Sequence, residues 1–293
     1  MIKSIIKICG FLFCAVLVAG EAPVAETPEP LQPDRVSFVL ANTVFVLFHE
    51  LGHALIHEFD LPVLGEEEDA ADTIATIILI STDRLDHEGR LSFLQVLMSA
   101  AEGQKLVWET GLESQNIDQF YWARHSLSVR RYHRIACLLY GSDPGRFEKI
   151  PNIIGMPEHR GDSCENEYDL ASRSVNTLGM QLRGGAPIGD IRKVEIPLYE
   201  DDTDDQLAAR LVGIMRERGT LGKVLNITAT VADLPAGMDV SLEDCEIPGA
   251  YWDPEDDTLI FCYQLMSTFY DLSAGQKLPD ILREFGVQVG GQP

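Results

Sequence analysis

The sequence predicts an α+β protein with a helical half at residues 35–183 and a mixed half at residues 184–293. Two observations predict this class. From Val36 to about Leu182, apolar residues recur at spacings of three and four, which is the period of a helix. After the glycine pair at 184–185, short β-prone runs bounded by turn residues surround one amphipathic helix.

The predicted elements follow in order along the chain. In the helical half we expect helices over residues 35–59, 69–82, 89–112, 125–141 and 164–182. In the mixed half we expect strands over 193–200 and 225–235, with a helix over 203–219 between them. Residues 243–272 are interpreted as a strand, a turn at Asp253–Asp257, a second strand and a helix.

The N-terminus has the pattern of a secretory signal peptide at residues 1–20. Lys3 and Lys7 precede an apolar run from Ile8 to Ala19, and small residues lead up to a cleavage site after Gly20. That run is shorter than the roughly 20 apolar residues of a membrane span, although an uncleaved anchor is the alternative. Residues 21–34 are rich in Pro, Glu and Ala and predict a disordered leader. We therefore expect a periplasmic or secreted protein with no membrane contact after cleavage.

The charge and the cysteines agree with export. A net charge of −23 disfavours nucleic acid or an anionic membrane surface as a partner, because both require basic patches. Once Cys9 and Cys14 leave with the signal peptide, an even number of cysteines remains, which predicts two disulfides. Three connectivities are possible, and sequence proximity favours the pairs Cys137–Cys164 and Cys245–Cys262.

The segment "FHELGHALIHEFDLPVLGEEEDAADTIA" (residues 48–76) places ionisable groups in an apolar helix. His49 and His53 are four residues apart, so both imidazoles can reach one metal ion from the same helix face. Glu50 is adjacent and can take a proton from a metal-bound water, which is the HExxH arrangement. Gly52 lets another segment approach this helix. His57 is interpreted as a surface residue near the end of the helix.

A catalytic zinc site needs a third protein ligand, and the acidic run after the Pro–Gly turn can supply it. Glu68 is the preferred ligand, because Asp72 lies one helical turn further on and can hydrogen-bond the second nitrogen of a ligating histidine. Glu67 is the alternative ligand. The expected cofactor is Zn²⁺.

With HExxH and ExxAD both present, the chain resembles gluzincin-type zinc metallopeptidases. It is more similar still to a bacterial family of metallopeptidases assigned largely by motif and known mainly as a domain of unknown function. The similarity continues through "HSLSVRRYHRIACLLYGSDP", "CENEY" and "CEIPGAYWDPEDDTLIFCYQL", and so spans most of the mature chain. This chain departs from that family at Arg124 and Ser128, which flank the HSL segment and stand where acidic residues are expected.

The resemblance implies a zincin-like fold that hydrolyses peptide or protein substrates. "GAYWDPEDDTLIF" is similar to the substrate-binding edge strand and following strand of neprilysin-like peptidases, with Gly249 in place of an asparagine. There the strand precedes HExxH, so its later position here suggests a circular permutation, with both halves forming one catalytic unit. Glu50 would be the general base, and His125 or Tyr251 would donate to the oxyanion. The alternative function is a catalytically idle, zinc-holding protein of the cell envelope.

Overall fold

The structure is a computed structural model that describes residues 29–82, 91–113, 127–182, 195–231 and 237–274. Residues 32–293 cluster into one unit. Their described part is mostly helical and contains a small four-stranded mixed sheet, so the predicted α+β class is confirmed. The predicted signal peptide (residues 1–20) and the first part of the predicted leader lie outside the described residues.

The helices of the first half follow the apolar spacing of the sequence, with ends that differ by a few residues. Pro33 occupies the first turn of the first helix, where its missing N–H costs nothing. The helices are α1 (Pro33–Glu58), α2 (Glu67–Ile80), α3 (Phe93–Glu113), α5 (Ser128–Ser142), the short α6 (Ile150–Ile154) and α7 (Glu158–Leu182).

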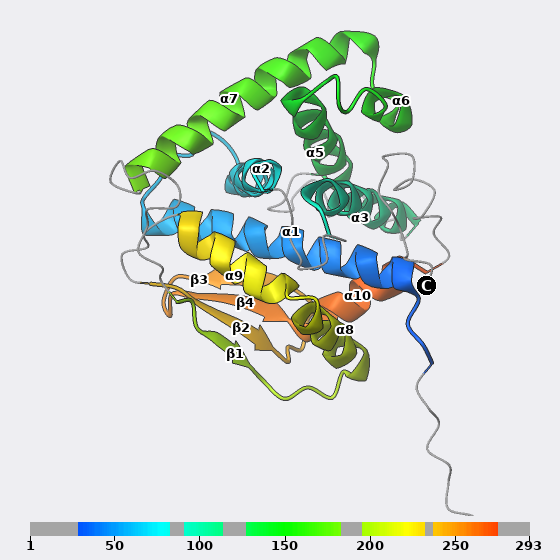
Figure 1. The fold of residues 1–293 in the computed structure, drawn as a ribbon, viewed down its shortest axis with the longest axis vertical. Coiled ribbons are helices and arrows are strands. Elements are labelled where there is room, and N and C mark those ends of the chain that lie inside the picture. The colour runs from blue at the N-terminus through cyan, green and yellow to red at the C-terminus, as the bar shows by residue number, and fades with distance from the viewer. Residues whose placement is uncertain (1–28, 83–90, 114–126, 183–194, 232–236, 275–293) are drawn as a thin grey trace, which may run out of the picture. The chain divides into compact units, whose positions relative to one another are not determined.

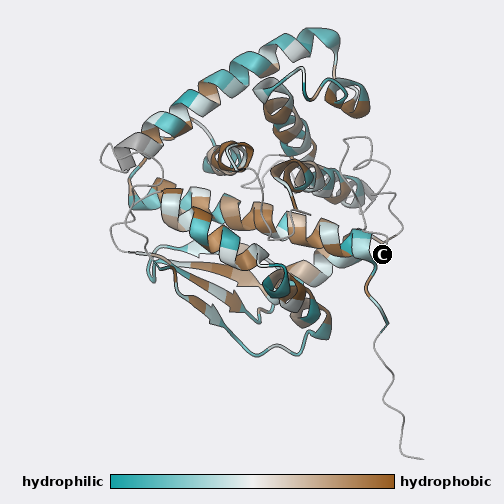
Figure 2. Ribbon diagram, viewed as in Figure 1, coloured by the Kyte–Doolittle hydropathy of each residue, from teal (hydrophilic) through white to brown (hydrophobic). Residues whose placement is uncertain are grey.

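Helix α1 is the centre of the packing. It contacts α2 and α3 on one side, and the sheet and the last described helix on the other (Figure 1). Phe38 and Phe48 on α1 are fully buried. Figure 2 shows apolar residues along α1 and the strands, whereas α7 is largely hydrophilic. Among the described helices, α1 alone is long and apolar enough to cross a membrane, but 89% of that stretch is buried inside the fold, as in a core helix.

The sheet comes from the second half of the chain and has the order β1–β2–β4–β3. The first three of these strands are parallel, and β3 is antiparallel to β4, which leaves β3 at an edge. Asp257 in the β3–β4 turn has a φ of 51°. The elements are β1 (Leu198–Glu200), α8 (Gln206–Glu217), α9 (Thr220–Val231), β2 (Asp239–Glu243), β3 (Ala250–Asp253), β4 (Thr258–Cys262) and α10 (Tyr263–Leu272).

Two elements of the mixed half differ from the prediction. The predicted strand over 225–235 is wrong, because its described residues belong to helix α9. β-Branched residues favour a strand there, but Leu221, Val224 and Thr228 are buried at helical spacing, and packing outweighs this weak propensity. Strand β2 is not predicted, because Val240 and Leu242 are its only apolar residues. Helix α8 and the strand–turn–strand–helix order of β3, β4 and α10 agree with the prediction.

The cysteines lie in the two pairs that sequence proximity favours. The Sγ atoms of Cys137 and Cys164 are 2.12 Å apart, which ties α5 to α7. Those of Cys245 and Cys262 are 2.07 Å apart, which ties the segment before β3 to the end of β4. The second pair therefore anchors the edge of the sheet that lies against α1.

Gly52 sets how closely α2 approaches α1. A Cβ atom at Gly52 would lie 2.8 Å from the Cα atom of Ala71, which belongs to the backbone of α2. We predict that Gly52→Ala lowers the free energy of unfolding by about 1–3 kcal/mol, because the two helices must move apart. Gly213→Ala on α8 is the matched control, because its Cβ would meet nothing within 4 Å. That control should raise the stability by about 0.5–1 kcal/mol. Denaturant unfolding of both variants measures this, and equal stabilisation by both would contradict it.

Candidate metal centre

Helix α1 presents His49 and His53 on one face, one turn apart. Their ring centroids are 4.9 Å apart with the rings nearly perpendicular, and their Nε2 atoms are 3.2 Å apart. Both side chains are largely buried. The helical spacing alone brings these two nitrogens together, as the sequence predicts.

Glu68 on α2 completes a triangle of possible ligand atoms. Its Oε2 lies 3.1 Å from the Nε2 of His49 and 3.4 Å from the Nε2 of His53. Two ligands held about 2.0–2.1 Å from a tetrahedral zinc ion would be separated by about 3.3–3.4 Å, so the three atoms fit the corners of one coordination sphere. Within the part of the chain that the structure describes, these three residues form the group that could hold a metal ion.

Each histidine also contacts a carboxylate through its other ring nitrogen. The Nδ1 of His49 lies 2.8 Å from Asp72 Oδ1, and the Nδ1 of His53 lies 2.6 Å from Glu67 Oε1. An imidazole that donates its Nδ1 hydrogen keeps the Nε2 lone pair for a metal. Asp72 therefore lies where the sequence predicts an orienting carboxylate. Glu67, the alternative ligand of the sequence analysis, faces the far side of His53 rather than the triangle.

Arg131 on α5 supports Asp72 and was not predicted from the sequence. Its Nε and Nη2 donate to the two carboxylate oxygens of Asp72, both at 2.7 Å. Asp72 is only 2% exposed. Burial would raise the pKa of Asp72, but the charge and hydrogen bonds of Arg131 hold it well below its usual range. The sequence gives little signal for this residue, because "RRYHR" contains several cations at helical spacings.

The electrostatics of the group favour positive charge. Burial would lower the pKa of His49, but its hydrogen bonds to Asp72 and Glu68 outweigh that effect and raise the pKa to about 9. The pKa of His53 is also raised, because Glu68 and Glu67 overcome its burial. A metal ion entering this group would replace protons, as is usual for histidine ligands.

Glu50 and the edge strand line a cleft beside the triangle. The cleft has a volume of about 530 Å³. Its lining comes from the end of α1, the start of α2 and strand β3. It consists of Glu50, His53, His57, Glu66, Glu67, Glu68, Ala250, Tyr251 and Trp252. Glu50 is 7% exposed, so a carboxylate lies next to the candidate ligands in a confined space.

Of the two residues expected to contact an oxyanion, only Tyr251 lies within the described residues. Tyr251 lines the cleft and is 47% exposed. Burial, together with the nearby charges of Glu243 and Asp253, raises its pKa, so the hydroxyl keeps its proton. His125 and the neighbouring Arg124 lie outside the described residues.

Two further histidines, His57 and His133, lie outside the triangle of candidate ligands. The Nε2 of His57 is 3.1 Å from Glu67 Oε1, the same oxygen that contacts His53. His57 is half-exposed, as expected of a surface residue, but it also lines the cleft. His133 instead lines a groove between α5 and α7, away from the residues of the metal cleft.

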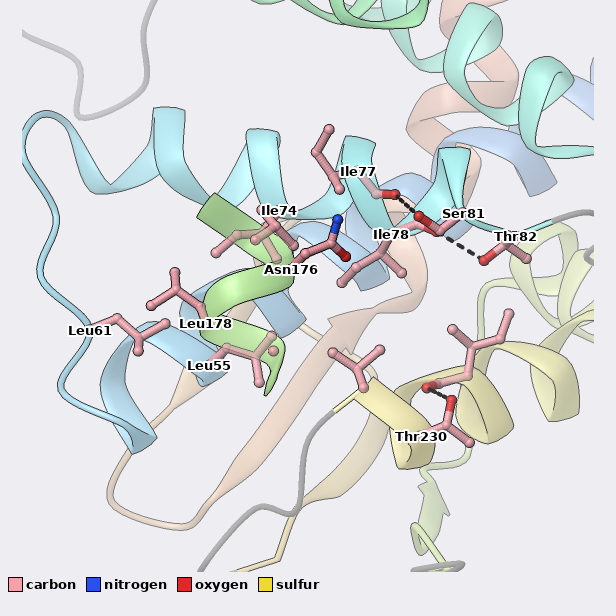
Figure 3. Close-up of a pocket in the computed structure, with 14 residues that line it drawn as sticks. Leu55, Leu61, Ile74, Ile77, Ile78, Ser81, Thr82, Asn176, Leu178 and Thr230 are labelled. Atoms are coloured by element: carbon pink, nitrogen blue, oxygen red, sulfur yellow. Dashed lines mark hydrogen bonds between the residues drawn. The ribbon is translucent and has the colours of Figure 1, made fainter. Parts of the chain in front are cut away.

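An apolar pocket on another side of α2 lacks the chemistry of the cleft. It has a volume of about 310 Å³ and lies between the ends of α1, α2, α7 and α9 (Figure 3). Aliphatic side chains such as Leu55, Ile74 and Leu178 line it. The hydroxyls of Ser81 and Thr230 donate to carbonyl groups of their own helices. No titratable side chain lines this pocket, so it lacks groups for acid–base or metal chemistry.

The fold and the site together define an α+β protein with a candidate mononuclear metal centre on an HExxH helix. The chain belongs to the family described as "Putative metallopeptidase" (DUF4344), whose sequence profile matches residues 4–178 and 199–284. No curated protein and no solved structure matches the chain. Membership of this family agrees with the resemblance that HExxH and ExxAD indicate.

Replacing the two adjacent glutamates decides which one holds the metal. We predict that Glu68→Gln abolishes stoichiometric zinc binding, because it removes the carboxylate that faces both Nε2 atoms. Glu67→Gln should weaken binding by only about 10–100-fold, as expected for a residue that orients a ligand. Titration against a chromogenic chelator measures both affinities. A larger loss in Glu67→Gln than in Glu68→Gln would reverse the assignment.

Removing the partner of Asp72 should destabilise the metal-free protein. We predict that Arg131→Met costs about 3–5 kcal/mol of unfolding free energy, because it leaves a buried charge unpaired. Arg134→Met is the matched control on the same helix, since its partner Asp69 is 20% exposed and the pair is partly solvated. That control should cost about 1 kcal/mol or less. Urea unfolding in the presence of a chelator measures both, and equal losses would show that Asp72 does not depend on Arg131.

Proposed function

We propose that this chain is an exported zinc-dependent metallopeptidase that hydrolyses peptide bonds. The observation that carries the proposal is the triangle of His49, His53 and Glu68, with Glu50 in the same cleft. Two imidazole nitrogens and one carboxylate oxygen are a donor set of catalytic zinc sites, and they leave one position open. A structural zinc site is usually closed by four protein ligands.

The metal supplies one part of the chemistry and the protein supplies the rest. Zinc, when bound, provides an activated water and polarises the substrate carbonyl. Glu50 would accept a proton as general base and then pass it to the leaving amine. Tyr251 would donate a hydrogen bond to the developing oxyanion, since its hydroxyl stays protonated. His125 is the other candidate for that role.

Strand β3 would hold the peptide. It pairs with β4 on one side only among the described strands, and its residues Ala250–Trp252 line the cleft. An extended peptide can add to such an edge as a further strand. The contacts of β3 and β4 with α1 support a zincin-like arrangement in which the strand follows the HExxH helix in sequence.

Export is supported by the cysteine pairs. Disulfides persist in oxidising compartments, so two pairs at disulfide distance favour a periplasmic or secreted location. The expected partner is therefore a peptide or protein outside the cytoplasm. The proposal includes the predicted signal peptide at residues 1–20.

The Glu50→Gln variant tests the mechanism. We predict that it lowers peptide hydrolysis by at least about 10²-fold while zinc stays bound at one ion per chain, because only the base is lost. Glu102→Gln is the matched control, since Glu102 is equally buried at 7% but lies on α3 outside the cleft. A peptide-library digest with and without chelator, alongside metal analysis, measures both properties.

Two outcomes would contradict the proposal in different ways. Unchanged hydrolysis by Glu50→Gln would remove Glu50 from the mechanism. Absence of any chelator-sensitive hydrolysis by the zinc-loaded wild type would instead favour a zinc-holding binding protein of the envelope.

A further inference from the structure

The lining of the metal cleft is strongly anionic. Four of its nine residues are glutamates, and none is lysine or arginine. A bound divalent cation would neutralise two of these four charges, so the cleft stays negative in the metal-loaded protein. Such a cleft, with low-dielectric walls, concentrates cations and repels anions.

Carboxylates just outside the lining add to this field. Glu243 and Asp253 act on Tyr251, whose pKa they help to raise. At the end of α1, burial and the neighbouring Asp257 raise the pKa of Glu58.

The two arginines that contact α2 form their ion pairs with carboxylates outside the lining. Arg131 and Arg134 on α5 contact Asp72 and Asp69, which are residues of α2 that do not line the cleft. Arg131 also acts on Glu68, so it offsets part of the charge of the cleft, but no arginine or lysine lines the cleft beside the other three glutamates.

Two aromatic side chains on β3 give the cleft a second feature that suits a cation. Tyr251 is 47% exposed and lines the cleft together with Trp252. The faces of tyrosine and tryptophan rings attract ammonium and guanidinium groups. Trp252 is only 8% exposed, and its Nε1 has no hydrogen-bond partner among the described residues.

We infer that the substrates of this cleft carry a positive charge, an ammonium or a guanidinium group, close to the bond that is cleaved. The inference rests on the proposed peptidase function and names its substrate class. The cation can be the side chain of a lysine or arginine, or the free amino group at the start of a peptide. Both sources offer the same chemistry to glutamates and aromatic rings, so the experiment must separate them.

The test uses matched decapeptides of alanine and glycine with one central residue. That residue is lysine, acetyl-lysine or glutamate, and each peptide is made with a free and with an acetylated N-terminus. For the zinc-loaded wild type at low salt, kcat/KM for a cationic peptide should exceed that for its neutral match by at least about tenfold. The difference should shrink as salt screens the field. Loss of the preference on acetylating the lysine identifies a side chain, whereas loss on acetylating the N-terminus identifies the terminal amine.

Two variants locate the preference. Glu66→Gln should reduce the difference between cationic and neutral peptides, because Glu66 lines the cleft at the start of α2. Glu217→Gln, an exposed residue at the end of α8, removes the same charge elsewhere and should leave the difference unchanged. Equal effects of the two variants would show that only the net charge of the protein matters and would overturn the inference.

Binding to the Glu50→Gln protein separates this inference from the proposed function. With the N-terminus of both peptides acetylated, calorimetry should show at least about tenfold tighter binding of the lysine peptide than of the acetyl-lysine peptide. If the terminal amine is the recognised cation, the same preference should appear for a peptide with a free N-terminus over its acetylated form. If nothing is hydrolysed but this preference is found, the inference holds as a binding specificity and the peptidase function fails. If the wild type cleaves all peptides equally well, the peptidase function stands and the inference fails.

Discussion

The candidate metal centre depends on how closely α2 can lie against α1. Where Gly52 on α1 meets Ala71 on α2, there is no room for a Cβ atom on α1. Gly52 precedes His53 in sequence, and Ala71 lies about one turn after Glu68. A shift of α2 outward would carry the carboxylate of Glu68 away from both imidazoles, while the helix spacing would keep the histidines together. The geometry of the ligand triangle is thus set by backbone packing between two helices as much as by the ligands themselves.

That packing places a charged group inside the fold, and Arg131 makes this tolerable. Asp72 is shared between the guanidinium on α5 and the imidazole on α1, so three helices meet at one carboxylate. A buried ion pair contributes little net stability unless its remaining lone pairs are also satisfied. Here the carboxylate of Asp72 also accepts from His49, whose ring must be held in place to act as a ligand. The cost of burying Asp72 is therefore linked to the orientation of His49.

Much of this site could be predicted from sequence, because short-range helix geometry determines it. His49, Glu50 and His53 need only a fixed period, and Asp72 needs only its spacing from Glu68. Whether Glu67 or Glu68 faces the histidines depends on how α2 is rotated about its axis. The conformation of the loop between α1 and α2 sets that rotation, and residue spacing does not predict it. Arg131 is a long-range contact with no local signal. Similarly, α9 was predicted as a strand because β-branched propensity is local, whereas its burial against α1 is not.

The position of the sheet late in the sequence also affects when the cleft can form during synthesis. The histidine helix lies near the N-terminus, but strand β3, which forms the other wall of the cleft, follows about two hundred residues later. Domains generally form from the N-terminal side as synthesis proceeds. The ligand helices therefore emerge long before Ala250–Trp252, and the cleft stays half-built until nearly all of the chain is available. The candidate metal centre would therefore gain its complete cleft only late in synthesis, after its ligands are already in place.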